Sequence, residues 1–579
     1  MLGTCYLGYL SFMKIRDIRN LTEFYILRKG VKMERKSAYV NTYLNKRVVT
    51  RTPQSQPVPG KEHKMSLNNA GGYTFTVDPW QKLERFLILG SESGTFYVSE
   101  KEHTYKNIKS LEYCITTDCK RTVDVIVAIS DAGRAPKNDP ALFALAMCAS
   151  FGDDKGKQYA LANLRKVARI GTHLFHFASY LNGMRGWGRG VRTAIGKWYT
   201  ERTPDNLSFM LAKYQTRDGW SNENIIRLSH PKASSEEVNA LLAWAVGKYD
   251  RSKHTSLIGL VYALELMKSA VNEKEVIALI NAFHMPQEVV PTEYRKSIAV
   301  WEAMLPNLGY TAILRNLGNM GSYGVLDSSE SRAFVYQTLV DEDKIKKGRV
   351  HPLAIAVALA IYSSGSGMRG SNSWKVTPMI KDALEIALLK SFGYIEPTGK
   401  TIAYCLDWSG SMTGVTICNS PLTCATATAI LSLACAKSEL DYHFMAFDNG
   451  IRPLNITKHT SFEDAIRETM GKNGGGTDCS LPARWAREQK LVIDAFVIMT
   501  DNETWAGKEH PIESLNRYRQ QFNPQAKQIV VGMVSTDFTI ADPDDLNSLD
   551  IVGFDTATPS MMSNFIRGGH GDAALSEQD

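Results

Sequence analysis

Three oxygen-bearing side chains stand at alternate positions in one short stretch of the chain, Asp407, Ser409 and Ser411. A carboxylate and two hydroxyls at this spacing can face one small cation, and hard ions such as Mg²⁺ take about six oxygen ligands. The stretch directly follows an apolar run at 401–406, which predicts a buried strand. Ligands of open α/β folds bind at the carboxyl ends of such strands, so the sequence predicts a cation site there.

Two later segments carry matching oxygen atoms. The glycine-rich loop GGGTD at 474–478 offers the hydroxyl of Thr477, and a second apolar strand at 497–500 ends in Asp501. Together the three loops supply one oxygen-rich set, formed by Asp407, Ser409, Ser411, Thr477 and Asp501. This is the pattern of the metal-ion-dependent adhesion site (MIDAS) of the von Willebrand factor A domain, which residues 400–568 resemble. The resemblance implies a divalent cation, Mg²⁺, as the cofactor.

Other interpretations of the first loop explain less. Asp407 could cap a helix and the two serines could be turn residues, but this accounts for one loop and not for three. A dehalogenase-type phosphatase requires a second Asp where Ser409 stands. A serine-hydrolase elbow requires Gly where Asp407 stands. The residues therefore favour coordination over catalysis.

The elements around these loops alternate between strand and helix. Strands are expected at 401–406, 442–447, 494–500, 528–534 and 551–554, and helices at 422–437, 461–470, 480–490, 510–521 and 559–567. Such alternation is typical of a parallel, doubly wound sheet. We expect this domain to span 396–568, with a flexible tail at 569–579.

The preceding region, 71–395, has a different pattern. Apolar residues recur at helical spacing in the segments 141–150, 158–168, 191–201, 207–215, 235–246, 255–270, 274–284, 297–304, 310–317 and 352–362. Many short amphipathic helices in tandem indicate stacked pairs of the HEAT or armadillo kind. No strict sequence period is present, so an irregular helical bundle stays open as the alternative.

The ends of the chain differ in charge. Residues 1–65 hold 13 Lys or Arg and 4 Asp or Glu, whereas residues 396–579 hold 14 and 24. The net charge of the whole chain is +7, so residues 66–395 carry +8, and an anionic partner would bind this middle part of the chain. Residues 1–70 include a Pro/Ser/Gln-rich stretch at 51–60 and are expected to form a flexible basic extension. No run of about 18 apolar residues occurs, and nine scattered cysteines suggest reduced thiols in the cytoplasm.

Basic and aromatic residues alternate at 213–220 (KYQTRDGW) and 227–232 (RLSHPK). Arg and Lys pair with phosphates, while Trp, Tyr and His stack on bases. On composition alone the other interpretation is favoured, a helix-loop-helix with Trp220 in the core and solvated charges.

The chain as a whole resembles the Ro autoantigen family, in which a ring of helical repeats, the TROVE module, is closed by a von Willebrand A domain. The resemblance covers about 72–568. It rests on GSESGTFY at 90–97, IRLSH at 226–230, TAILRNLG at 311–318, GMRG at 367–370, GGTDCSLP at 475–482, TDNET at 500–504 and FTIADPDD at 538–545. Members of this family bind Y RNAs on the outer surface of the ring. They take single-stranded 3′ ends of misfolded noncoding RNAs into its central hole.

The resemblance also implies roles for single residues. Lys213, Arg217 and His230 fall on the family's basic RNA-binding positions, which overturns the interpretation from composition. Arg169 and His173 match another basic segment, and Gln215 replaces what is often a basic residue. We therefore expect a monomeric, non-catalytic RNA-binding protein of RNA quality control, without membrane contact. The sequence does not decide whether an exoribonuclease is recruited.

Two rival classes of function remain. A metal nuclease would need a general base near the metal, for which only His443 and His510 are candidates. A protein-binding scaffold would act through the A domain and its metal. Charge reversal at Lys213 and Arg217 would leave such a scaffold active, whereas it would abolish RNA binding.

Overall fold

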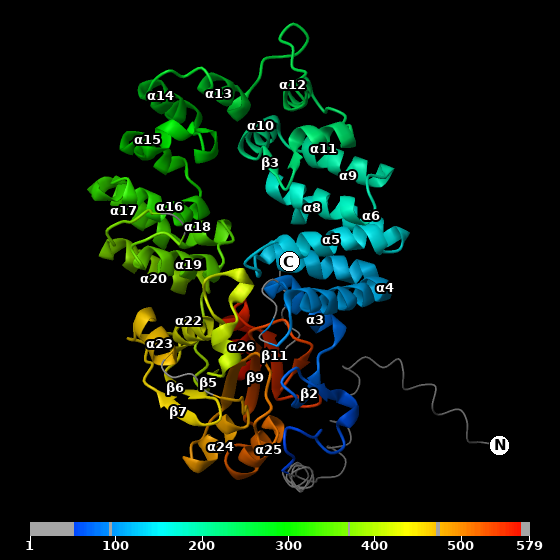
Figure 1. Cartoon of the computed structure of the whole chain (residues 1–579), viewed down its shortest axis with the longest axis vertical. Coiled ribbons are helices and arrows are strands. Elements are labelled where there is room, and N and C mark those ends of the chain that lie inside the picture. The colour runs from blue at the N-terminus through cyan, green and yellow to red at the C-terminus, as the bar shows by residue number, and fades with distance from the viewer. Residues whose placement is uncertain (1–50, 92–94, 96, 369–370, 471–474, 569–579) are drawn as a thin grey trace, which may run out of the picture. The chain divides into compact units, whose positions relative to one another are not determined.

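The computed structural model describes residues 51–91, 95, 97–368, 371–470 and 475–568 (Figure 1). The extension at 1–50 and the tail at 569–579, both predicted to be flexible, lie outside the described residues. Within the described ranges, no helix is both long and apolar enough to cross a lipid bilayer.

A long series of helices follows the first strands, as the sequence predicts. The larger ones are α3 (Pro79–Leu89), α4 (Glu100–Ala132), α5 (Asp139–Phe151), α6 (Asp154–Ala162), α8 (Gly171–Met184), α9 (Arg189–Thr200), α10 (Pro204–Lys213), α11 (Asn222–Ser229), α12 (Glu236–Ala245), α13 (Gly259–Met267), α14 (Glu273–Phe283), α15 (Ile298–Met304), α16 (Tyr310–Ser322), α17 (Ser329–Val340), α18 (Glu342–Lys347), α19 (Pro352–Ser363) and α20 (Pro378–Ser391). The short α7 (Leu164–Val167) precedes α8. Each packs on near neighbours in sequence, such as α4 on α5, α10 on α13 and α19 on α20 (Figure 1). The predicted helical-repeat region is confirmed.

The longest helix, α4, was not anticipated as one element. It runs for 33 residues, but Asp118 leaves the helical conformation at φ −155° and ψ 91°. Charged and polar residues fill most of its outer face, so the sequence shows no continuous apolar stripe. Burial of Leu111, Cys114, Val123 and Ile126 against neighbouring helices holds both halves in place. Packing against neighbouring helices therefore stabilises α4, although the local sequence pattern does not predict it as one helix.

The α/β region contains one sheet of six strands in the order β11-β9-β8-β5-β6-β7. Its parallel strands are β5 (Thr401–Asp407), β6 (Asp441–Phe447), β8 (Ala495–Thr500), β9 (Lys527–Gly532) and β11 (Ser548–Val552). The helices of this region include α22 (Cys424–Ala436), α23 (Phe462–Met470), α24 (Leu481–Glu488), α25 (Pro511–Gln521) and α26 (Thr558–Arg567). All six residues of β8 are buried, because a strand with helices on both faces has no solvated side.

The predicted parallel sheet is confirmed except at one edge. β7 (Ile451–Leu454) pairs antiparallel with β6, so the sheet is mixed. A four-residue strand behind a short turn gives little periodic signal, and Pro453 within it is tolerated because β7 is an edge strand.

The sequence predicts a flexible extension that includes 51–70. In the structure, residues 51–78 do not form a free linker. β1 (Met65–Leu67) and β2 (Tyr73–Thr76) form a three-stranded sheet with β10 (Phe538–Thr539). Val58, Met65 and Phe75 belong to the second hydrophobic core, which lies on one side of the large sheet. The Pro-rich composition predicts flexibility, but the partners that order this segment lie more than 400 residues further along the chain.

Both ends of the helical region contact the α/β region. From the first helices, Arg85 of α3 pairs with Asp550 of β11, and His103 of α4 contacts the Ser535 hydroxyl at 2.8 Å. Further along, Lys381 of α20 pairs with Glu463 of α23 at 2.7 Å. The eight cysteines in the described ranges are all buried.

Candidate metal centre and nucleic-acid interface

The loop after β5 holds its carboxylate through a fixed set of hydrogen bonds. Asp407 is fully buried, and its Oδ1 accepts from the backbone N–H of Ser409 at 2.9 Å. Its Oδ2 accepts from the Thr500 hydroxyl of the neighbouring strand β8 at 2.6 Å. The hydroxyls of Ser409 and Ser411 lie 3.0 Å apart. The spacing of two residues thus brings the three predicted oxygen-bearing side chains together.

The other two predicted residues reach the same edge of the sheet. β5 and β8 pair in register, with Leu406 opposite Met499, so Asp407 at the end of β5 and Asp501 directly after β8 lie at adjacent strand ends. The Thr477 carbonyl accepts hydrogen bonds from the backbone N–H groups of Trp505 and Ala506, each at 3.0 Å. The loop after β8 therefore holds the Thr477 loop beside it.

The electrostatics of this edge suit a bound cation. Burial raises the pKa of Asp407 to about 7, and the nearby charge of Asp501 adds to the shift. Burial likewise raises the pKa of Asp501. The Thr477 hydroxyl is buried and has no hydrogen-bond partner in the described structure. Two crowded carboxylates and an unpartnered hydroxyl are what a hard divalent cation would satisfy, so these residues fit Mg²⁺.

The five predicted metal ligands include three hydroxyl side chains and only two from the group His, Cys, Asp and Glu. In the described ranges, no group of three or more His, Cys, Asp or Glu side chains has an arrangement suited to a metal. Asp407 and Asp501 supply the only two such ligands in the predicted set, and the remainder are Ser and Thr. Zinc favours His and Cys, so this composition points to a hard cation.

Sequence reasoning missed two titratable residues near this edge. Burial and the charge of Asp501 raise the pKa of Glu503 to about 8. Burial, with the charges of Asp501 and Glu503, raises the pKa of Tyr97 to about 12. Glu503 could have been found, since it stands two residues after Asp501, whereas Tyr97 comes from the helical region and gives no local signal. Trp408, an unusual residue at its position, packs under the Arg452 guanidinium at 3.8 Å.

The two histidines considered as nuclease bases have structural partners. His510 caps α25, contacts the Gln56 carbonyl at 2.7 Å, and has a pKa lowered by burial. His443 lies edge-on to Trp485, with ring centroids 6.4 Å apart.

Three of the predicted RNA-binding residues lie on α10, on β3 and at the end of α11. Lys213 ends α10 and lies over the rings of Phe209 and Tyr214, at 5.3 and 5.6 Å. Arg217 lies on β3 (Thr216–Arg217), and 60% of its side chain is exposed. His230 is an exposed residue in left-handed conformation at the end of α11.

A tight hairpin presents Arg217. β3 pairs antiparallel with β4 (Trp220–Ser221), and the two residues between them, Asp218 and Gly219, both have positive φ. An Asp-Gly pair is typical of a type I′ turn, so this signal was available in the sequence. The hairpin packs on α8.

Arg169 and His173 make contacts within the protein. Arg169 donates to the Ser130 hydroxyl at 2.9 Å and to the Lys166 carbonyl at 3.0 Å. His173 lies 3.4 Å from the amide of Asn138, and burial with the nearby charge of Arg169 lowers its pKa to about 4. The two residues are therefore close to each other but less available than Arg217.

His176, which sequence reasoning missed, links these two groups. Its ring lies between the carboxylates of Asp139 and Asp218, with nitrogen–oxygen distances of 2.6 and 3.0 Å. The contact with Asp139 raises its pKa. One side chain of α8 thus ties α5 to the turn that carries Arg217. Its position three residues after His173 on one helix was a weak signal.

Comparison with known proteins identifies the family. Residues 66–283 and 285–363 match the TROVE domain model, and residues 402–566 match the model of the Ro60 vWA domain. The RNA-binding protein RO60 of Deinococcus radiodurans is 38% identical over 515 residues, which cover 88% of this chain and 96% of that protein. The RNA-binding protein RO60 of Caenorhabditis elegans is 32% identical over 86% of this chain and 90% of that protein.

A solved structure supports the same assignment. The crystal structure of the Deinococcus radiodurans RO (RSR) protein aligns with a TM-score of 0.65 and 37% identity, over 85% of this chain and all of that one. Sequence and fold agree along nearly the whole described length. The chain therefore belongs to the Ro60 family of RNA-binding proteins, with a TROVE domain followed by a Ro60-type von Willebrand A domain.

Proposed function

We propose that this chain is a non-catalytic RNA-binding protein of RNA quality control in the cytoplasm, acting as a monomer. Its partners would be a Y RNA or a similar small noncoding RNA, and misfolded RNAs with single-stranded 3′ ends. The observation that carries the proposal is the position of Lys213, Arg217 and His230 within the TROVE match, on α10, on β3 and at the end of α11, where Arg217 and His230 are exposed.

The hairpin is suited to phosphate contacts. Arg217 is held at a tight turn, and most of its side chain is exposed. Lys213 is anchored by two aromatic rings and approaches one carboxylate, Glu288, at 3.9 Å. Cations fixed in this way bind a phosphate backbone without reading sequence, and their affinity falls as salt rises.

Two RNA sites would have different roles, one for single-stranded 3′ tails and one for a Y RNA. A hole wide enough for a single strand excludes a duplex, so a free 3′ tail is sensed by its thickness. A Y RNA bound at the outer basic surface would compete with the body of a misfolded RNA. The Y RNA would thereby control the access of misfolded RNA to the protein. This role requires no covalent chemistry of the protein.

We include the metal centre in this proposal as a site that is separate from the RNA-binding sites. Asp407, Ser409, Ser411, Thr477 and Asp501 would hold Mg²⁺. When bound, a hard cation supplies a site for one further oxygen ligand. The A domain carries net negative charge, so this ligand is better sought on a protein than on RNA.

The test compares two RNAs at several salt concentrations. One is a duplex with a single-stranded 3′ tail, and the other is the same duplex with blunt ends. We expect tighter binding of the tailed RNA. The double variant Lys213→Ala/Arg217→Ala should weaken binding and flatten the slope of log K against log salt by about 1.4, because about 0.7 is lost for each phosphate contact to a single strand.

A matched control removes a lysine and an arginine from the A domain. Arg467 is 74% exposed and pairs with Asp464, much as Arg217 lies beside Asp218, and Lys458 is exposed as well. Lys458→Ala/Arg467→Ala should bind both RNAs as the wild type does. Equal, weak binding of the two RNAs, or equal losses in the two double variants, would contradict the proposal.

A protein-binding scaffold is the second candidate, because aromatic side chains are exposed close to the metal edge. Trp505 is 44% exposed and Tyr97 is 40% exposed. Exposed aromatic residues are common at protein interfaces. This role predicts that Asp407→Ala/Ser409→Ala abolishes a protein interaction while RNA affinity is kept. If every protein interaction survives that change, the scaffold role is abandoned.

A further inference from the structure

Residues 51–78, which we call the strap, contact two of the three metal loops. Near the start of the strap Gln54 is fully buried, and its side chain makes four hydrogen bonds. Its amide nitrogen donates to Asp478 Oδ1 at 3.1 Å and to the Glu509 carbonyl at 3.0 Å. Its amide oxygen accepts from the Thr504 hydroxyl at 2.7 Å and from the Gly507 N–H at 3.1 Å.

These partners adjoin the residues predicted to hold the metal. Asp478 directly follows Thr477, and Thr504 stands three residues after Asp501. The Thr504 hydroxyl also lies 3.1 Å from the Thr477 carbonyl, so the two loops meet at that point. Gln54 therefore connects the loop that carries Thr477 with the loop that carries Asp501.

A second part of the strap holds the loop after β8 from another direction. Asn69 Nδ2 donates to the Glu503 carboxylate at 2.7 Å, and the Ala70 N–H donates to it at 3.1 Å. Asn68 Nδ2 donates to the Thr504 carbonyl at 2.7 Å. At Gly72 the chains approach so closely that a Cβ would lie 2.0 Å from the Thr504 carbonyl oxygen, so only glycine fits.

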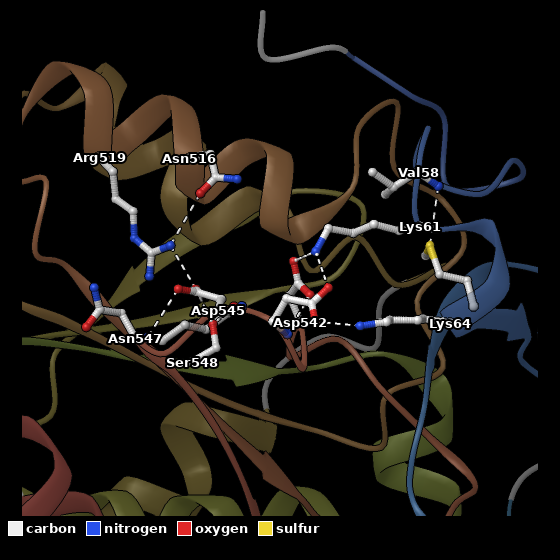
Figure 2. A network of polar contacts seen from close by, with 12 residues as sticks. Val58, Lys61, Lys64, Asn516, Arg519, Asp542, Asp545, Asn547 and Ser548 are labelled. Carbon is white, nitrogen blue, oxygen red and sulfur yellow. Dashed lines mark hydrogen bonds and ion pairs between the residues drawn. The ribbon is translucent and has the colours of Figure 1, made fainter. Parts of the chain in front are cut away.

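The strap is itself anchored to the A domain by charge. Lys61 Nζ lies 2.5 Å from Asp542 and 3.2 Å from Asp544, and Lys64 Nζ lies 2.5 Å from Asp544. Figure 2 shows both lysines extending from the strap toward the loop of Asp542. The Thr52 N–H and hydroxyl donate to Glu513 at 2.7 and 2.9 Å. Contacts on both sides of Gln54 thus fix its position.

We propose that the strap is a structural part of the metal centre and that Gln54 is a positioning residue, which sets the placement of Thr477 relative to Asp501. The inference rests on the proposed metal site. The chemistry requires an amide, because one end must donate to a carboxylate while the other accepts from a hydroxyl. A buried partner left unsatisfied would shift the loops, and residues that orient metal ligands change affinity although they do not touch the ion.

The test measures Mn²⁺ binding to the full chain by calorimetry, with Mn²⁺ as a hard cation that takes oxygen ligands. Gln54→Glu keeps the size of the side chain but replaces the donor to Asp478 with an acceptor. We expect a loss of Mn²⁺ affinity of about tenfold or more. Gln56, two residues away, has an exposed side chain, so Gln56→Glu is the matched control and should bind as the wild type does.

Asn69→Ala provides a second variant at an exposed position, where folding is not at risk. It removes one donor to Glu503, and we expect a smaller loss of about threefold, in line with one hydrogen bond. If the wild type binds no Mn²⁺, the proposed metal site itself fails. If the wild type binds and Gln54→Glu binds equally well, the positioning role is overturned while the site stands. Should Gln54→Glu not fold, unchanged affinity in Asn69→Ala overturns the proposal that the strap is a structural part of the metal centre, because Asn69 holds Glu503 in the loop after β8.

Discussion

Arg85 of α3 and Asp550 of β11 are joined by two hydrogen bonds, in which Arg85 Nη2 donates to the two carboxylate oxygens at 2.7 and 2.6 Å. Both side chains are buried, with 1% and 7% exposed. Arg85 Nη1 donates to the carbonyls of Thr536 and Phe538 at 2.9 and 3.0 Å. One guanidinium therefore connects the start of the TROVE region with the end of the A domain.

Arg85→Met should destabilise the protein strongly. The change leaves the Asp550 carboxylate buried without its cation, which typically costs about 3 to 5 kcal/mol. The measurement is the midpoint of urea-induced unfolding. The control is Lys120→Met, which breaks an exposed ion pair with Asp124 and should cost less than about 1 kcal/mol. Equal midpoints for the two variants would show that the buried pair does not hold the domains together.

Much of the fold follows from local sequence. The apolar run before Asp407 and the one before Asp501 predict β5 and β8, and the structure places the two as neighbours. Because both strands run in parallel, their ends meet, which is why five residues from three loops were predicted as one site. Here local pattern and global topology agree.

Other features depend on partners that are remote in sequence. Gln54 lies in a stretch whose composition is typical of a linker, and its hydrogen bonds go to residues 424 to 455 positions away. Asp118 interrupts α4, and packing on neighbouring helices stabilises the two halves of this helix. No periodicity or propensity encodes such contacts, because they arise only when the tertiary fold brings the segments together.

Below pH 6.5, His103 should make stability depend on pH. Burial lowers its pKa to about 4, and its ring contacts the Ser535 hydroxyl. The unfolded chain binds a proton near pH 6.5, whereas the folded chain stays neutral until about pH 4, so stability falls as pH drops through this window. The loss amounts to about 3 kcal/mol, at 1.36 kcal/mol for each pKa unit.

His103→Gln tests this effect by unfolding at a series of pH values. The glutamine keeps a polar contact for Ser535 but does not titrate, so the curve of unfolding free energy against pH should be shallower between pH 6.5 and 4. His351 is fully buried with a pKa lowered to about 3, and it acts in the same direction, so some slope remains. A variant curve parallel to that of the wild type would refute the assignment.

Gly318 of α16 should not tolerate a side chain. A Cβ there would lie 2.8 Å from the ring of Trp374, which packs against this helix. Gly318→Ala would gain helix propensity of about 1 kcal/mol but force the tryptophan to move, at a typical cost of about 1 to 3 kcal/mol. The control is Gly183→Ala inside α8, where no atom lies within 4 Å of the added Cβ. We expect a lower thermal midpoint only for Gly318→Ala, and equal midpoints would contradict the steric argument.

His176 should make RNA binding depend on pH through Arg217. Its ring lies between Asp139 of α5 and Asp218 of the hairpin turn, and His173 and Arg217 also lie near it. The contact with Asp139 raises its pKa, so the protonated ring and its two ion pairs are fully present below pH 6.5 and are lost as pH rises through the folded-state value. Loss of that proton leaves the carboxylates of Asp139 and Asp218 without the cation between them, and Asp218 lies beside Arg217.

We therefore expect affinity for the tailed RNA to fall by up to about fivefold between pH 6 and 8.5 at constant salt, equivalent to about 1 kcal/mol for a half-exposed pair. His176→Gln removes the titrating group but keeps a side chain that can contact Asp218, so its affinity should vary less over this range. Arg217→Ala provides the control, because the effect is transmitted through that cation and should vanish in its absence. If His176→Gln shows the same pH dependence as the wild type, the proton is taken up elsewhere, and the hairpin is held by packing on α8 alone.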